Sequence, residues 1–105
     1  MIRKGFLIQA KPGMAKEYER RHNLIWPELY STLKEHGVLN FSTFLHEQTD
    51  QLFCYVEIED EGKFNAIAEK DICKQWWKYM TEVLVCDSPA ANKAKEDMLR
   101  EVFHI

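Results

Sequence analysis

Three side chains that could exchange protons or stack on a ligand lie one helical turn apart. Tyr18, His22 and Trp26 are each four residues from the next, and residues four apart lie on the same face of a helix. Pro27 follows directly. Because proline lacks an amide hydrogen and disfavours helix in the residue before it, the helix should kink or restart there. A phenol, an imidazole and an indole are therefore expected to gather beside a backbone irregularity.

His22 is the candidate for acid–base chemistry, because histidine is the side chain whose proton moves most easily near neutral pH. A single histidine in a helix is more often an ordinary surface residue. The aromatic residues one turn before and one turn after His22 are not typical of a solvated face, however, and they favour a site. His36, His46 and His104 have no such neighbours, and His36 precedes Gly37 as a helix-end residue would.

Trp76 and Trp77 form a second aromatic group. Such a pair is most often part of a core or a dimer contact. Adjacent helical residues point about 100° apart, however, so both indoles cannot serve one core face equally. At least one of them is expected to be free for a ligand. A flat indole with a polar rim suits the apolar face of a sugar ring or of a polycyclic substrate.

The sequence contains no motif typical of a metal or cofactor site. It lacks His-Glu-x-x-His, paired cysteines and a glycine-rich phosphate loop, and no Ser or Cys lies in a recognisable nucleophile motif. Any catalysis should therefore be cofactor-free and of the acid–base kind. The cysteines Cys54, Cys73 and Cys86 are odd in number and far apart. They suit free thiols in a reducing compartment, and the cytoplasm is expected.

Length and composition indicate one globular domain over residues 1–105. Charged residues make up 30% and hydrophobic residues 46% of the chain, which excludes a disordered composition. The formal net charge of −3 argues against nucleic acid as a partner. No apolar run approaches the roughly 20 residues that a membrane-spanning helix needs, so no membrane association is expected.

The rest of the sequence predicts the elements that would position these residues. Their order, strand, helix, two strands, helix, strand, is the split βαβ arrangement of α+β ferredoxin-like domains. This βαββαβ fold has a four-stranded antiparallel sheet with its helices on one face. Strands are expected at 2–9, 38–47, 52–59 and 101–105, and helices at 14–36 (interrupted at Pro27), 63–70, 72–83 (capped by Asp71) and, briefly, 92–99.

The strand at 52–59 predicts how the sheet is covered. Leu52, Cys54, Val56 and Ile58 alternate with Phe53, Tyr55 and Glu57, so one face is core and the other is aromatic. An apolar sheet face without helices usually marks an association or ligand surface. The economical arrangement is a homodimer in which two sheets face each other as a dimeric α/β barrel.

The chain resembles the L-rhamnose mutarotase family over essentially its whole length. The resemblance lies in the first four residues, in the block 17–29 (EYERRHNLIWPEL), in the block 71–81 (DICKQWWKYMT) and in the ending 101–103 (EVF). The histidine block and the double-tryptophan block together are specific to the family. Either block alone would be a weak signal.

This resemblance implies an isomerase of carbohydrate metabolism, a cytoplasmic homodimer that interconverts the α and β anomers of L-rhamnose without a cofactor. It implies that His22 is the proton donor and that Tyr18, Trp76 and Trp77 bind the sugar. The family has a tyrosine in its second strand where this chain has Phe41. The missing hydroxyl removes one hydrogen bond or requires another group to supply it, and Phe41 is still expected to line the pocket.

Two other functions fit the same fold, since unrelated functions share it. A cofactor-free monooxygenase of the dimeric ferredoxin-like class would have a larger and mostly apolar pocket. A non-catalytic dimeric binding module would leave His22 dispensable. A sugar pocket, in contrast, needs several convergent polar groups.

Overall fold

The computed structural model describes residues 1–105, and its elements follow the βαββαβ order with the helical segments subdivided. The strands are β1 (Ile2–Gln9), β2 (Val38–His46), β3 (Gln51–Ile58) and β4 (Asp97–Leu99). The helices are α1 (Ala15–Asn23), α2 (Pro27–Glu35), α3 (Glu61–Asn65), the 3-10 helix η1 (Ala66–Glu69) and α4 (Asp71–Met80). No helix combines the length and the apolar character needed to cross a membrane.

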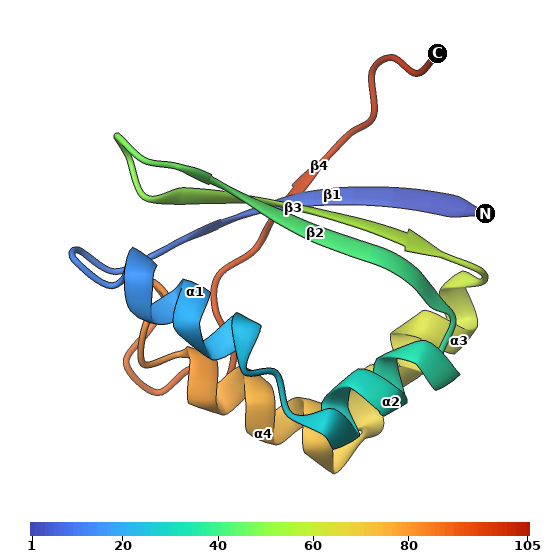
Figure 1. Ribbon diagram of the computed structural model, residues 1–105, viewed down its shortest axis with the longest axis horizontal. Coiled ribbons are helices and arrows are strands. Elements are labelled where there is room, and N and C mark those ends of the chain that lie inside the picture. The colour runs from blue at the N-terminus through green and yellow to red at the C-terminus, as the bar shows by residue number, and fades with distance from the viewer.

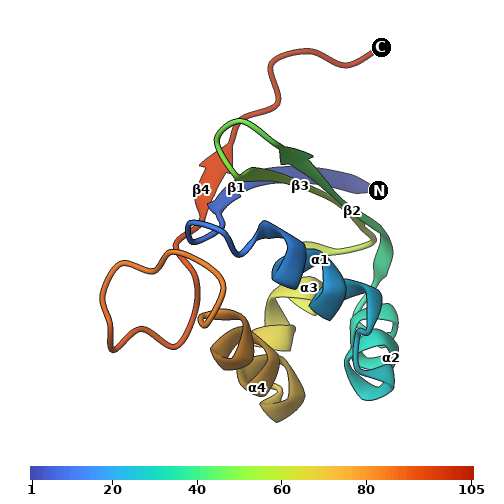
Figure 2. The ribbon, with the colours of Figure 1, turned by 60° about the vertical axis from the view of Figure 1, so that its left-hand side comes forward.

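The four strands form one antiparallel sheet in the order β2-β3-β1-β4. All the helices lie on the same side of this sheet, and the other side is left uncovered (Figures 1 and 2). This is the ferredoxin-like arrangement that the element order predicts, and the prediction of the fold class is confirmed.

The alternation in β3 decides which face is the core. Leu52, Cys54, Val56 and Ile58 are all buried against the helices, as predicted. In the register with β1, Leu52 lies opposite Ile8 and Ile58 lies opposite Ile2, so alternate residues of β1 face the helices too.

The helical segment before β2 breaks where Pro27 requires it. α1 ends at Asn23, and α2 begins with Pro27 as its first residue, preceded by the extended Trp26. Gly37 then ends the second helix with a φ of +83°, a conformation that glycine adopts without strain. Both predicted boundaries are confirmed, and the break turns α2 away from the direction of α1 (Figure 1).

The C-terminal predictions are wrong. Residues 92–99 contain no helix, because Asp97–Leu99 pair with Leu7–Gly5 along the otherwise open edge of β1, where a strand satisfies backbone groups that a helix would leave unpaired. Residues 101–105 have no regular structure and extend past the end of the sheet. Asp71 is the first residue of α4 and not its cap, which is Lys70.

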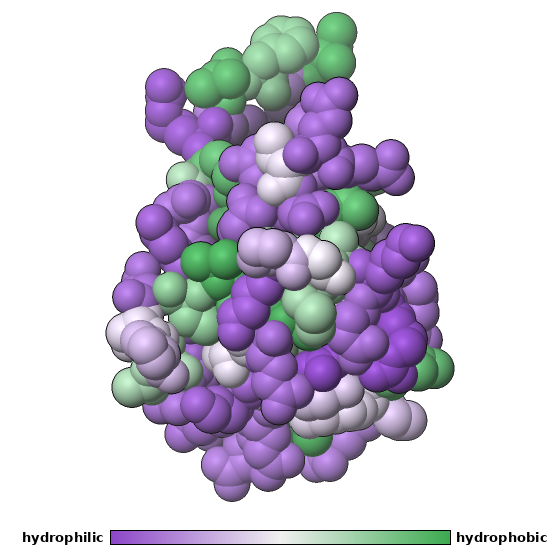
Figure 3. Space-filling model, turned by 90° about the vertical axis from the view of Figure 1, so that its left-hand side faces the viewer, coloured by the Kyte–Doolittle hydropathy of each residue, from purple (hydrophilic) through white to green (hydrophobic).

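The uncovered sheet face and the C-terminal tail expose hydrophobic side chains. Phe44 of β2 lies opposite Phe53 of β3 on this face, and Phe44 is 64% exposed. Beyond β4 the tail extends away from the domain and forms a largely hydrophobic protrusion at the top of Figure 3. Its exposed apolar residues are Val102, Phe103 and Ile105.

Candidate active site

Tyr18 and His22 form the centre of the site, because α1 brings them onto its sheet-facing side. Tyr18 is only 4% exposed. Its ring stacks on the imidazole of His22, with centroids 4.2 Å apart and an angle of 24° between the planes. The four-residue spacing in the sequence is therefore realised as a direct contact between the two rings.

The backbone fixes the orientation of the His22 imidazole. Its Nδ1 lies 3.4 Å from the carbonyl oxygen of Tyr18. A carbonyl can only accept a hydrogen bond, so this contact assigns the ring proton of the neutral form to Nδ1 and leaves the lone pair of Nε2 free. Burial lowers the pKa of His22 below its ordinary value, since a buried site disfavours the charged form. At neutral pH, His22 is therefore an uncharged base.

No carboxylate hydrogen-bonds to His22. Glu17, on the same helix, accepts hydrogen bonds from Arg20 and Arg21 instead, and these guanidinium groups lower the pKa of Glu17 to about 2. Arg21 also donates to the carbonyl oxygen of Tyr79 at 2.9 Å and lies 4.0 Å from the centre of the Tyr79 ring. These contacts attach α1 to α4 and so hold His22 beside Trp76 of α4.

Trp76 is the indole that contacts His22. The two rings meet edge to face, with centroids 5.3 Å apart, and Trp76 is 6% exposed. Trp26, which the spacing in the sequence placed next to His22, packs instead against Trp76 at 5.0 Å and stacks on Tyr79 at 5.4 Å. Trp26 therefore supports the indole of Trp76.

Trp77 differs from Trp76 in its surroundings, as expected for adjacent helical residues. It is half-buried, and the ammonium group of Lys93 lies 4.3 Å from the centre of its ring. Such a contact is a favourable cation–π interaction. Both tryptophans nevertheless line the same cavity.

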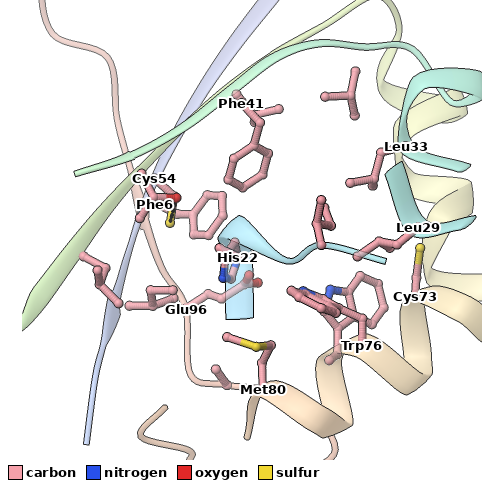
Figure 4. Close-up of a pocket in the computed structure, with 18 of the residues that line it drawn as sticks. Phe6, His22, Leu29, Leu33, Phe41, Cys54, Cys73, Trp76, Met80 and Glu96 are labelled. Carbon is pink, nitrogen blue, oxygen red and sulfur yellow. Dashed lines mark hydrogen bonds between the residues drawn. The ribbon is translucent and has the colours of Figure 1, made fainter. Parts of the chain in front are cut away.

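Phe41 approaches the cavity from the sheet. It lies opposite Val56 in the register of β2 with β3, and its ring meets that of Phe6 edge to face at 6.2 Å. It is 43% exposed, which excludes a dry core position. Figure 4 shows the two phenylalanine rings on the sheet side of the cavity, with His22 and Trp76 on the helix side.

The cavity has a volume of about 870 Å³ and lies between the sheet and the helices. This volume is within the usual range for small-molecule sites. Most of the lining residues are hydrophobic, and the polar ones include Asn23, Thr43 and Glu96. All five residues predicted from the sequence line it: Tyr18, His22, Phe41, Trp76 and Trp77. Their roles toward a ligand stay predictions.

Several polar side chains of the cavity were not predicted from the sequence, among them those of Thr43, Cys54 and Glu96. Thr43 and Cys54 lie opposite each other on β2 and β3, and alternation from Phe41 could have found Thr43 because the two residues share a face. Glu96 precedes β4 and borders the cavity (Figure 4). It could not be placed, because the segment 92–99 was predicted as helix.

Comparisons with known proteins agree with the resemblance seen in the sequence. Residues 3–105 match the family model described as L-rhamnose mutarotase. The L-rhamnose mutarotase of Tolumonas auensis is 55% identical over 105 residues, which are 100% of this chain and 99% of that protein. The L-rhamnose mutarotase of Opitutus terrae is 52% identical over the same shares of the two chains.

Solved structures give the same result for the fold. The crystal structure of an L-rhamnose mutarotase from Formosa agariphila has a TM-score of 0.87 and 30% identity, and the match covers 100% of this chain and 99% of that one. Two more distant structures share the fold alone. One is a putative antibiotic biosynthesis monooxygenase from Nitrosomonas europaea (TM-score 0.64, 10% identity, 98% and 100% covered). The other is a dimeric ferredoxin-like protein from an uncultured marine organism (TM-score 0.59, 11% identity, 98% and 90% covered).

Proposed function

The chain belongs to the L-rhamnose mutarotase family, and from this premise we propose that His22 carries the proton transfers by which it interconverts the α and β anomers of L-rhamnose. The activity makes the protein an isomerase. The observation that supports the role of His22 is its uncharged imidazole, which stacks on Tyr18 at the wall of the cavity with Nε2 unengaged.

The reaction exchanges protons but has no net proton change. Ring opening removes a proton from the C1 hydroxyl, breaks the bond between C1 and the ring oxygen, and places a proton on that oxygen. Rotation at C1 of the open aldehyde and closure by the reverse steps give the other anomer. A positioned acid or base contributes on the order of 10²–10⁴ in rate to such a step.

His22 acts in both halves of this sequence. Its neutral imidazole accepts the proton of the C1 hydroxyl at Nε2 during ring opening. The resulting imidazolium returns that proton to the C1 oxygen during ring closure, which is the donor role that the family resemblance implies. The ring oxygen takes its proton from solvent or from a second side chain. Because burial lowers the pKa of His22, the imidazolium gives up its proton readily.

Aromatic side chains hold the sugar beside His22. Trp76 and Trp77 present indole surface to the cavity from α4, and Phe41 presents its ring from β2. Indole rings pack well against the C–H face of a sugar while leaving its hydroxyl groups free for polar contacts. Tyr18 borders the same space, is 4% exposed and stacks on His22.

The composition of the cavity alone does not separate a mutarotase from the monooxygenase alternative. Its volume and its mostly hydrophobic lining resemble what an apolar substrate would require. The identity to L-rhamnose mutarotases over the whole chain decides between the two, whereas the monooxygenase shares only the fold. The same identity disfavours a non-catalytic binding module.

We also propose that the protein is a cytoplasmic homodimer. The uncovered sheet face exposes Phe44, Phe53 and Leu99, and a second copy of the sheet would cover them. One of the solved structures that share the fold is a dimeric ferredoxin-like protein. The apolar tail ends beyond the same sheet and is available to the partner. All three cysteines are free, which suits a reducing compartment.

Exchange between the anomers of L-rhamnose, measured by NMR saturation transfer with and without the protein, tests the proposed function. The protein should accelerate the exchange in proportion to its concentration, and His22→Gln should abolish most of the acceleration. Loss of acceleration only in the variant supports the role of His22. No acceleration by the wild-type protein would contradict the function itself.

A further inference from the structure

The segment before β4 places a carboxylate at the cavity. Glu96 lines the cavity, and its side chain extends into it from the chain that leads to β4 (Figure 4). The Glu96 side chain is 30% exposed. Glu19 of α1 is the other acidic residue of the lining, but it is exposed. Glu96 is therefore the carboxylate better placed to meet a ligand inside the cavity.

A lysine joins Glu96 to the aromatic wall of the cavity. The ammonium group of Lys93 lies 3.1 Å from Oε1 of Glu96 and 4.3 Å from the centre of the Trp77 ring. All three residues line the cavity. The indole, the ammonium group and the carboxylate thus form one continuous part of the wall, in which an apolar surface lies beside a charged edge.

Most of the acceptor capacity of the Glu96 carboxylate is free. The Lys93 ammonium is the one polar partner that the chain gives it, whereas a carboxylate offers about four acceptor sites. The ion pair does not explain why a charge lies here, because partly exposed pairs contribute little to stability. Burial and, to a smaller extent, the charge of Glu96 raise the pKa of Cys54 to about 11, which agrees with a carboxylate that faces the space between sheet and helices.

We propose that Glu96 is a substrate-binding residue, which accepts hydrogen bonds from hydroxyl groups of the sugar while C1 is held at His22. An ionised carboxylate has no proton to donate, but its two oxygens can accept from two neighbouring hydroxyls. Hydrogen bonds to a charged group are stronger than neutral ones. Trp77 packs against the C–H face of the sugar, and Glu96 supplies polar recognition that the mostly hydrophobic lining lacks. The inference rests on the proposed function for the identity of the ligand.

Calorimetric binding of L-rhamnose and anomer exchange by NMR, measured on the same variants, test this proposal. Because the ion pair contributes little to stability, Glu96→Gln and Glu96→Ala should fold as the wild type does. We expect Kd to rise about 10-fold in Glu96→Gln and about 10- to 100-fold in Glu96→Ala, while kcat changes less than about threefold. An unchanged Kd in both variants would overturn the proposal. So would a loss of kcat with an unchanged Kd, which would assign Glu96 to proton transfer and not to binding.

Glu59→Gln is the matched control for the loss of a charge. Glu59 also pairs with a lysine, with its Oε2 3.4 Å from the ammonium group of Lys63, but neither residue lines the cavity. Its Kd should stay at the wild-type value, and a rise equal to that of Glu96→Gln would overturn the proposal. Lys93→Gln leaves the Glu96 carboxylate in place and should raise Kd less than Glu96→Gln does. An equal or larger rise in Lys93→Gln would overturn a direct contact between Glu96 and the sugar.

Deoxy sugars test the contact from the side of the ligand. The 2-deoxy, 3-deoxy and 4-deoxy analogues of L-rhamnose each lack one hydroxyl group. At least one of them should bind the wild type about 10-fold more weakly than L-rhamnose does, and Glu96→Gln should bind that analogue and L-rhamnose within about twofold of each other. Equal discrimination by the wild type and the variant for all three analogues would overturn the proposal. A wild-type protein that binds L-rhamnose through Glu96 without accelerating anomer exchange would instead contradict only the proposed function.

Discussion

The phenol ring of Tyr18 lies face to face with the imidazole of His22, with centroids 4.2 Å apart. The contact buries one side of the imidazole, and the backbone carbonyl of Tyr18 occupies its Nδ1 at 3.4 Å. Only Nε2 is then left for chemistry. The residue that buries His22 is thus also the residue that orients it.

Replacing His22 should remove the proton transfer and leave the fold intact. We expect His22→Gln to lower the rate of anomer exchange by about 10²- to 10⁴-fold, measured by NMR saturation transfer, with an unchanged circular dichroism spectrum. His36→Gln is a matched control, because the Nδ1 of His36 also contacts the carbonyl four residues earlier, that of Thr32. A His22→Gln variant that keeps the wild-type exchange rate would show that His22 does not transfer the proton.

The activity should depend on pH through the neutral form of His22. Burial lowers the pKa of His22, so the imidazole stays neutral below the ordinary histidine value of about 6.5. As the pH falls through the lowered pKa, the imidazole becomes protonated and kcat/KM should decline. The midpoint of that decline should therefore lie below about pH 6.5. A midpoint above that value would contradict the assignment of the neutral form.

The stability should show the same titration. Between the ordinary pKa and the lowered native pKa, the unfolded chain binds a proton that the folded chain does not. The free energy of unfolding should therefore fall as the pH drops below about 6.5, and this contribution should level off below the native pKa. His22→Gln should show a smaller decline over that window in chemical denaturation at fixed protein concentration.

The two tryptophans should separate in their effects. Trp76 is buried between His22 and Trp26, so Trp76→Ala should cost about 3–5 kcal/mol of stability. Trp77 is half-buried, and Trp77→Ala should cost about 1 kcal/mol while raising KM for the sugar. Denaturation curves and exchange kinetics measure the two effects. If the two substitutions cost the same stability and Trp77→Ala left KM unchanged, both tryptophans would serve only in packing.

Phe41→Tyr should keep the fold, because Phe41 is 43% exposed and its added hydroxyl would reach the cavity and not a dry core. If that hydroxyl finds a partner on the sugar, affinity should improve by about 0.5–1.5 kcal/mol. The melting temperature and the KM for L-rhamnose measure the two outcomes. A lower melting temperature with unchanged KM would show that position 41 does not contact the sugar.

A charge on the uncovered sheet face should break the dimer. Phe44→Glu places a carboxylate opposite Phe53, where two copies of the sheet would meet, and sedimentation should show a monomer at micromolar concentration. Leu24→Glu is the control, because Leu24 is equally exposed but lies between α1 and α2 on the helix side. A wild-type protein that sediments as a monomer would contradict the dimer.

Local patterns determined much of this protein. The four-residue spacing of Tyr18 and His22, the helix break at Pro27 and the alternation of Leu52, Cys54, Val56 and Ile58 each express a rule that acts over a few residues. The structure realises all of them. The double tryptophan also follows such a rule, since adjacent helical residues cannot share one environment.

The secondary structure of the C-terminal segment was decided by tertiary contacts. Residues 92–99 carry a helix-like composition, but Asp97–Leu99 pair with the edge of β1 that lies opposite β3. No local pattern records this. The position of Glu96 at the cavity follows from the same pairing.

The choice of partners around His22 was likewise decided in three dimensions. The spacing in the sequence predicted Trp26 as the indole next to His22. The packing of α4 against α1 instead places Trp76 against the imidazole, and Trp26 packs against Trp76. Thr43 and Cys54 meet each other only because β2 and β3 pair in one register. Helical and strand periods fix which side a residue faces, whereas packing between elements fixes what it meets there.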